Sequence, residues 1–182
     1  MTRSIPAVAL GLALLAATLV GACSAKPQIV TAPPASAGAN ATPMATGTSA
    51  GDLGTYPLGA AVTVGGTSGV TVRVIKFERN PPCKDLSAAS GTSLVGVSVD
   101  YVPVAAGVPY AMTDWTARND AGTPITPQAA CYKDVLGTGT TAASTAQAHT
   151  SGWLVLQVPT ASQHLFVTYT GTAGSKVAWQ LY

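Results

Sequence analysis

From Tyr56 to the end of the chain, apolar and polar residues alternate in short runs separated by Gly, Pro, Asn and Asp. An alternation of period two predicts a β-strand with one buried face, because successive side chains of a strand point to opposite sides. The clearest run is "SLVGVSVDYVPV", in which Gly96, Ser98 and Asp100 separate the apolar positions. The apolar positions, which should face the core, are Val95, Val97, Val99 and Tyr101.

Further segments of the same kind bring the predicted set to about seven strands, with no convincing helix. "GVTVRVIKFE" alternates Val70, Val72 and Val74 with other residues, whereas the consecutive apolar residues of "SGWLVLQVP" suggest burial on both faces. The remaining segments are 61–64, "PYAMTDWTARNDAG", "HLFVTYTG" and "SKVAWQLY". Turn residues at short intervals favour an all-β fold, an antiparallel β-sandwich, with a small closed β-barrel as the alternative.

The N-terminal segment has a different pattern, in which one positive charge at Arg3 precedes an almost unbroken apolar stretch from Ala7 to Val20. A stretch of about 14 residues has the length of a secretory signal and is too short to cross a hydrocarbon layer of roughly 30 Å. Residues 1–22 are therefore predicted to be a targeting element that takes no part in the fold.

The end of this apolar stretch, Leu19-Val20-Gly21-Ala22-Cys23, resembles the lipobox of bacterial lipoproteins. The resemblance implies cleavage after Ala22 and a thioether link between the Cys23 thiol and diacylglycerol, so that Cys23 becomes the lipidated N-terminus of a lipoprotein. Two or more acyl chains give a durable anchor, since each buried methylene contributes about 0.8 kcal/mol. The alternatives are an ordinary signal peptide with a coincidental cysteine, or an uncleaved N-terminal anchor.

Residues 23–54 are rich in Pro, Ala, Thr, Ser and Gly and show neither of the two hydrophobic periods. Such a composition buries too little apolar surface to offset the entropy of ordering, so the segment is predicted to be a disordered tether. A flexible chain of about 30 residues has a root-mean-square span of roughly 30 Å. The folded domain is therefore expected to occupy residues 55–182.

The order of segments in 55–182 resembles the immunoglobulin-like domains of unknown function in secreted actinobacterial antigens and lipoproteins. The resemblance is carried by the Trp115 strand, which leads into the turn Asp120-Ala121-Gly122, and by the segment that runs from Gly152 to Val158-Pro159. It implies an immunoglobulin-like sandwich and an extracytoplasmic setting. It carries over no catalytic residue.

Once Cys23 is assigned to the lipid, Cys83 and Cys131 remain as a pair. Disulfides persist in exported proteins, and closing a loop of this length removes denatured-state entropy worth about 4 kcal/mol. A disulfide is therefore predicted between them. It would hold "CKD" and "CYKD" together and present one surface, a candidate interaction surface that consists of Lys84, Asp85, Lys133 and Asp134.

The composition and the side chains that could carry chemistry exclude several classes of function. Only 9% of residues are charged and the formal net charge is +2, so no basic stripe exists that would bind nucleic acid. The two histidines, His149 and His164, lack the neighbouring groups that a hydrolase or a metal site would need. Trp115, Trp153 and Trp179 lie in alternating strands, where core positions are more usual than a sugar-binding face.

These observations predict a non-enzymatic binding or protein-interaction module, anchored by lipid to the extracytoplasmic face of the cell membrane and without a cofactor or metal. Its expected partners are the membrane, through the N-terminal lipid, and an envelope protein or ligand, but no nucleic acid. The alternative function is an accessory carbohydrate-binding or hydrolytic envelope protein that uses an open sheet face.

Overall fold

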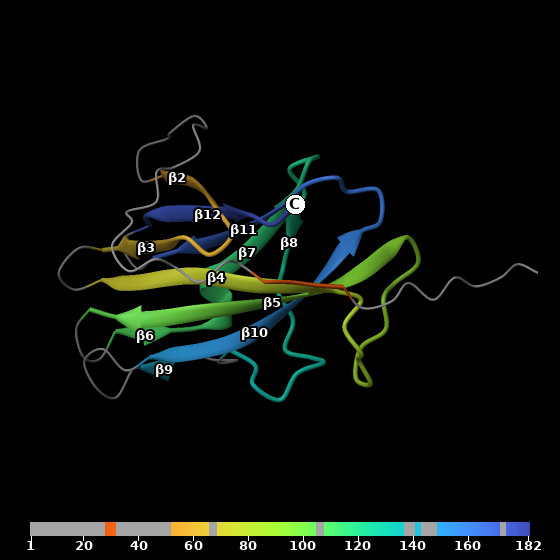
Figure 1. Ribbon diagram of the computed structural model, residues 1–182, viewed down its shortest axis with the longest axis horizontal. Coiled ribbons are helices and arrows are strands. Elements are labelled where there is room, and N and C mark those ends of the chain that lie inside the picture. The colour runs from red at the N-terminus through yellow and green to blue at the C-terminus, as the bar shows by residue number, and fades with distance from the viewer. Residues whose placement is uncertain are drawn as a thin grey trace, which may run out of the picture.

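The computed structural model describes residues 28–31, 52–65, 69–104, 108–136, 141–142, 149–171 and 174–182, and Cys23 with its lipobox lies outside them. Two β-sheets pack face to face as a sandwich, and not as a closed barrel (Figure 1). The predicted all-β, antiparallel-rich sandwich is therefore confirmed. In the described part of the chain, no helix has the length and apolar character that a bilayer span requires.

Sheet A contains the central strands of the predicted set. Its strands, in spatial order, are β1 (Gln28–Thr31), β4 (Val70–Arg79), β5 (Thr92–Pro103) and β10 (Thr150–Pro159). A fifth strand, β3 (Ala61–Val64), pairs with the same edge of β4 as β1 does, at the opposite end of that edge. All of these pairs are antiparallel.

Sheet B contains the strand order found in variable-type immunoglobulin domains. Its strands are β2 (Asp52–Pro57), β12 (Lys176–Gln180), β11 (Leu165–Thr170), β7 (Trp115–Asn119) and β8 (Pro124–Ile125), in that order. The run β12-β11-β7-β8 corresponds to strands G, F, C and C′ of such domains, and the β5–β10 pair corresponds to their B–E pair. β2 lies parallel to β12. Outside the two sheets, β6 (Pro109–Tyr110) pairs with β9 (Thr141–Ala142).

The core between the sheets is built from the positions that the alternation predicted. Trp115 and Trp179 are fully buried, with ring centroids 5.9 Å apart, and Tyr169 lies 5.1 Å from Trp115. The indole N–H of Trp179 donates a 2.8 Å hydrogen bond to the carbonyl of Ala60. The inward valines of β4 and β5 are also buried, as are Val177 and Leu181 beside Trp179.

The segment "PYAMTDWTARNDAG", predicted as one strand, is interrupted. Between β6 and β7 the chain forms a short 3₁₀ helix, η2 (Met112–Asp114), and the Asp114 carboxylate accepts a 2.9 Å hydrogen bond from the Ala111 backbone N–H. Burial raises the pKa of Asp114, and the hydrogen bond from Ala111 partly offsets this effect. The expected turn that follows is present, since the Gly122 N–H donates to the Asn119 carbonyl at 2.9 Å.

One strand lies inside residues 23–54, where an unstructured tether was expected, and a second begins there. β1 pairs with β4 over its whole length, and β2 begins at Asp52 rather than after the tether. The physical reason is long-range pairing, because Val30 packs against the core and the edge of β4 supplies backbone hydrogen-bonding groups that local composition cannot reveal. Residues 32–51 lie outside the described residues.

Candidate interaction surface

The predicted disulfide is present and organises the outer face of sheet A. Cys83 lies in the connection between β4 and β5, and Cys131 lies between β8 and β9, 48 residues further along the chain. Their Cα atoms are 4.4 Å apart. Both connections extend below sheet A in Figure 1, so the disulfide joins two loops that emerge from different sheets.

Residues 128–136, held by this disulfide, run along the outer strand of sheet A. Gln128 and Val155 exchange two backbone hydrogen bonds, of 2.8 and 3.1 Å. Further along, the Trp153 N–H donates to the Asp134 carbonyl at 2.8 Å, and the Leu136 N–H donates to the Trp153 carbonyl at 3.1 Å. The edge of β10 is therefore occupied by the chain's own backbone and is not free to pair with another strand.

Tyr132 lies flat across this face. Its ring stacks on Trp153 with a centroid distance of 4.0 Å and an interplanar angle of 7°. Its hydroxyl donates a 3.0 Å hydrogen bond to Glu78, a buried carboxylate. Burial, followed by the hydrogen bond to Glu78 and the charge of that carboxylate, raises the pKa of Tyr132 well above its usual value. Tyr132 is thus a fixed, protonated donor that covers sheet A.

Two glycines in the strands make room for this covering segment. A Cβ atom placed on Gly96 would lie 1.9 Å from the Tyr132 hydroxyl oxygen, and one placed on Gly152 would lie 2.7 Å from the Leu136 Cα. Glycine inside a strand often marks such a close approach. The alternation in β5 was interpreted as one buried face, and this interpretation is wrong, because the positions at Gly96, Ser98 and Asp100 are buried as well.

A β-bulge in β4 gathers charged side chains on the same outer face. The register with β5 shifts between Val74 and Lys76, so Arg73 before the bulge and Lys76 and Glu78 after it all lie on one side of the sheet. The Lys76 ammonium lies 5.0 Å from the centroid of the Trp153 ring, a cation–π contact. Without the bulge, Lys76 and Glu78 would point into the core.

A charged cluster that the sequence did not indicate lies further along this face. Asp100 is buried and forms an ion pair with Arg73. The Nε2 atom of His149, whose side chain is 59% exposed, lies 3.0 Å from Asp100 Oδ1, an oxygen that accepts no well-aligned hydrogen bond within the described residues. The only available signal was Asp100 itself, the one charged residue of β5.

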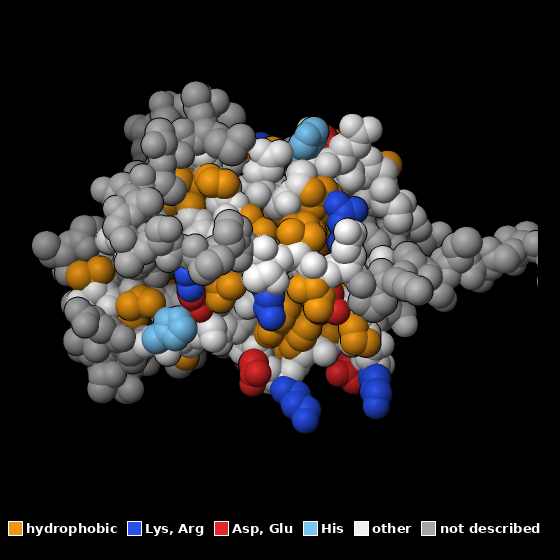
Figure 2. Space-filling view, viewed as in Figure 1, with side chains coloured by type: hydrophobic (Ala, Val, Ile, Leu, Met, Phe, Trp, Pro, Cys, Tyr) orange, Lys and Arg blue, Asp and Glu red, His pale blue; other side chains and the backbone are white. Residues whose placement is uncertain are grey.

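The four residues of the predicted interaction surface are all exposed. The disulfide joins the loop that contains Lys84 and Asp85 to the loop that contains Lys133 and Asp134. That the four residues form one interaction surface stays a prediction. None of the ion pairs found among the described residues involves them. Figure 2 shows acidic and basic side chains projecting from the lower edge of the molecule, where both loops lie.

Other candidates from the sequence have structural roles. Asp120 accepts hydrogen bonds from the backbone N–H groups of Gln163 and His164, which lower its pKa, the bond from Gln163 most. Trp115 and Trp179 lie in the core and therefore cannot contribute to an exposed sugar-binding face. Among the described residues, no cluster of three or more His, Cys, Asp or Glu side chains could hold a metal ion.

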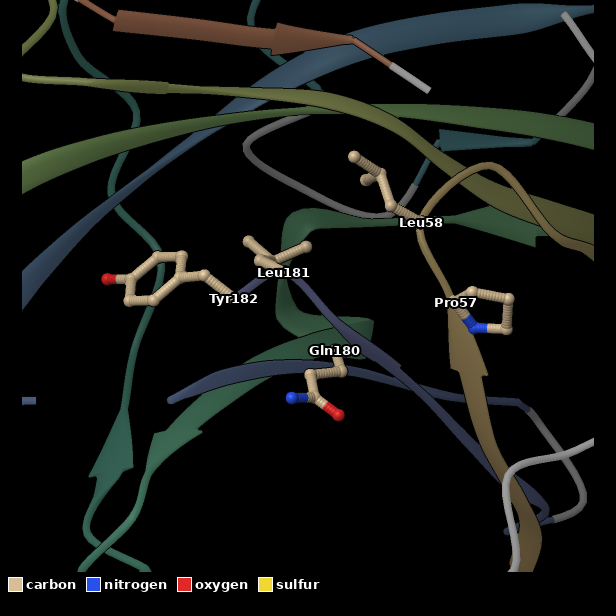
Figure 3. A pocket seen from close by; sticks show the side chains of 5 residues that line it. All are labelled: Pro57, Leu58, Gln180, Leu181 and Tyr182. Atoms are coloured by element: carbon tan, nitrogen blue, oxygen red, sulfur yellow. The ribbon is translucent and has the colours of Figure 1, made fainter. Parts of the chain in front are cut away.

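An open, mostly apolar hollow lies between the end of β2 and the C-terminal residues that follow β12 (Figure 3). It has a volume of about 260 Å³. Arg79 places its guanidinium 3.7 Å from the centroid of the Tyr182 ring, which forms one side of the hollow. The lining residues are Pro57, Leu58, Gln180, Leu181 and Tyr182.

No protein-family model matches the sequence, and comparison with curated proteins gives no significant match. Among solved structures, the chain is similar to MPT63, a secreted protein from Mycobacterium tuberculosis, with 15% identity, a TM-score of 0.51, and coverage of 69% of this chain and 95% of that one. Two further similar structures are the yjhA protein from Bacillus subtilis (12% identity, TM-score 0.48, coverage 66% and 96%) and an uncharacterized β-sandwich protein from Clostridium difficile (13% identity, TM-score 0.45, coverage 78% and 100%). At these identities the likeness concerns the fold alone.

Proposed function

We propose that this protein is a non-catalytic binding module of the cell envelope, anchored by a lipid on Cys23 to the extracytoplasmic face of the membrane. The observation that carries the binding role is the disulfide-clasped surface, which we define as Lys84, Asp85, Lys133 and Asp134. Four exposed charges from two distant loops are held together by the Cys83–Cys131 bond. The lipobox supports the anchor, and the secreted nature of the similar MPT63 fits an extracytoplasmic setting.

The clasped surface has the properties that favour recognition of a protein. The disulfide and the Tyr132–Trp153 stack fix the loop that contains Lys133 and Asp134, so a partner would order little further chain on binding. Charges of both signs in a fixed pattern give specificity and faster association with a complementary surface. The pattern has no net charge, which distinguishes it from a site for nucleic acid.

The binding role can be tested by photo-crosslinking in intact envelopes. A photoreactive amino acid is placed at position 84 or 133, and at position 176 as the control, since Lys176 is exposed on β12 of the other sheet. We expect one adduct of the same mass from positions 84 and 133 and none from 176. The charge swap of Lys133→Asp with Asp134→Lys, which keeps the composition, should reduce the adduct from position 84 at least tenfold. Equal adducts from all three positions would contradict the proposal.

The anchor and the lack of catalysis have separate tests. Mass spectrometry of the mature N-terminus should find Cys23 with diacylglycerol attached, and the Cys23→Ser variant should leave the membrane fraction. A broad hydrolase panel should give no turnover with the purified protein. Turnover that is lost in His149→Ala would contradict the non-catalytic role, because His149 lies beside the buried carboxylate of Asp100.

A further inference from the structure

We propose that β1 holds the sandwich against the membrane, so that the end of sheet A that contains Arg79, with the neighbouring hollow at Tyr182, rests on the lipid surface. This inference rests on the proposed lipid anchor at Cys23. It assigns to β1 the role of a short strap, in place of a free tether of about 30 residues that would let the domain move through roughly 30 Å.

The first step is the docking of β1 on the sandwich. β1 pairs antiparallel with the second half of β4, with Gln28 opposite Arg79 and Thr31 opposite Lys76. Of its side chains, Val30 is half-buried and packs against the core, while Ile29 is 60% exposed. The strand is therefore attached chiefly through its backbone ladder and one side chain, and its first residue lies beside the end of β4.

The second step is the reach of the chain between the lipid and β1. Gln28 follows Cys23 by five residues. An extended chain spans at most about 3.6 Å per residue, so these residues reach about 18 Å at full extension. The paired Cα atoms of Gln28 and Arg79 lie about 5 Å apart, as in any antiparallel pair. The anchor therefore keeps the Arg79 end of sheet A within about 25 Å of the acylated cysteine.

The third step is the chemistry of the surface at this end. The Arg79 guanidinium lies over the Tyr182 ring, and Leu58, Leu181 and Pro57 line the adjoining open hollow (Figure 3). Aromatic rings, short apolar patches and cations are the groups that favour the headgroup region of a bilayer. The end of the sandwich that the strap brings to the membrane is thus chemically suited to lie on a lipid surface.

The test is neutron reflectometry on the full-length lipidated protein in a supported bilayer, which measures the hydrated gap between headgroups and protein. We expect a gap of less than about 20 Å, because the chain from Cys23 to Gln28 spans about 18 Å at full extension. The Ile29→Pro/Val30→Pro variant removes two of the four backbone N–H groups of β1 and should widen the gap to roughly 30 Å. Ala35→Pro, a proline outside β1, is the matched control and should leave the gap unchanged.

The measured gap and the mass of the N-terminus together decide between the strap and the anchor. If the variant with two prolines unfolds with the same midpoint as the control but the gap does not widen, β1 is not the strap and the inference is overturned. A gap of roughly 30 Å in the unmodified protein overturns it as well. Mass spectrometry of the same sample separates the two proposals: absence of the lipid mass overturns the anchor and the strap together, whereas a lipidated protein with a wide gap overturns the strap alone.

Discussion

Replacing Gly96 by alanine should destabilise the sandwich through Tyr132. The added Cβ atom would lie 1.9 Å from the Tyr132 hydroxyl oxygen, and this phenol is held between the Trp153 ring and the Glu78 carboxylate. The ring cannot shift along the sheet without losing both contacts. We therefore expect Gly96→Ala to expel the Tyr132 side chain from its position.

The magnitude follows from the contacts that are lost. A hydrogen bond to a charged group contributes about 1.5–3 kcal/mol, and a stacked aromatic pair about 0.5–1.5 kcal/mol. Alanine offsets about 0.4–1 kcal/mol of this loss, because it reduces the entropy of the unfolded chain relative to glycine. Gly96→Ala should therefore lower the free energy of unfolding by about 1–4 kcal/mol.

A double-mutant cycle with Tyr132→Ala is the decisive assay. Urea unfolding of the disulfide-bonded protein, followed by far-UV circular dichroism, gives the free energy of unfolding for each variant. With Tyr132 already truncated, the methyl group of Gly96→Ala meets no phenol, so the second substitution should be neutral or slightly stabilising. The coupling energy should then equal the lost contacts, about 2–4.5 kcal/mol, whereas additivity within about 0.5 kcal/mol would refute the reasoning.

Three other changes have defined outcomes. Replacing Cys83 and Cys131 by alanine opens the 48-residue loop and should lower the free energy of unfolding by about 4 kcal/mol, measured by urea unfolding; an unchanged midpoint would contradict this. Trp179→Phe removes the buried bond to the Ala60 carbonyl and should cost about 2 kcal/mol or more, so a thermal midpoint equal to the native one would count against that bond. Backbone hydrogen bonds lower the pKa of Asp120. The contribution of this carboxylate to stability is therefore present above pH 3.8 and is lost as the pH falls through the lowered pKa. Free energies of unfolding measured from pH 7 to pH 2 should show this loss in the native protein but not in Asp120→Asn.

The strands of the core could be predicted because their signal is local. Each of the seven predicted segments contains a strand, and Val70, Val97 and Trp179 face the core, as their alternation indicated. Side-chain direction in a strand depends only on the period of the backbone, so the inward positions can be counted along the chain. The strands β6, β8 and β9 have two residues each, too few to show a period, and β1 depends on its pairing with β4.

The outer face of sheet A could not be predicted, because its structure depends on contacts between distant segments. Gly96 appeared to be an exposed position between two valines, and only the path of residues 128–136 shows why a side chain is excluded there. Likewise, the bulge after Val74 decides that Lys76 points outward. A bulge inserts one residue into a regular alternation. The apolar positions do change phase between Val74 and Phe77, but only the pairing with β5 shows that a bulge is the cause.

The sequence alone determined the all-β class, the inward residues of the main strands and the pairing of the two cysteines. Each of these follows from local periodicity or from the number of cysteines available. Only the tertiary structure decided that Tyr132 covers sheet A, that Arg73, Asp100 and His149 meet, and that β1 docks on β4. These features are contacts between segments far apart in the chain, and the packing of both sheets decides which segments come into contact.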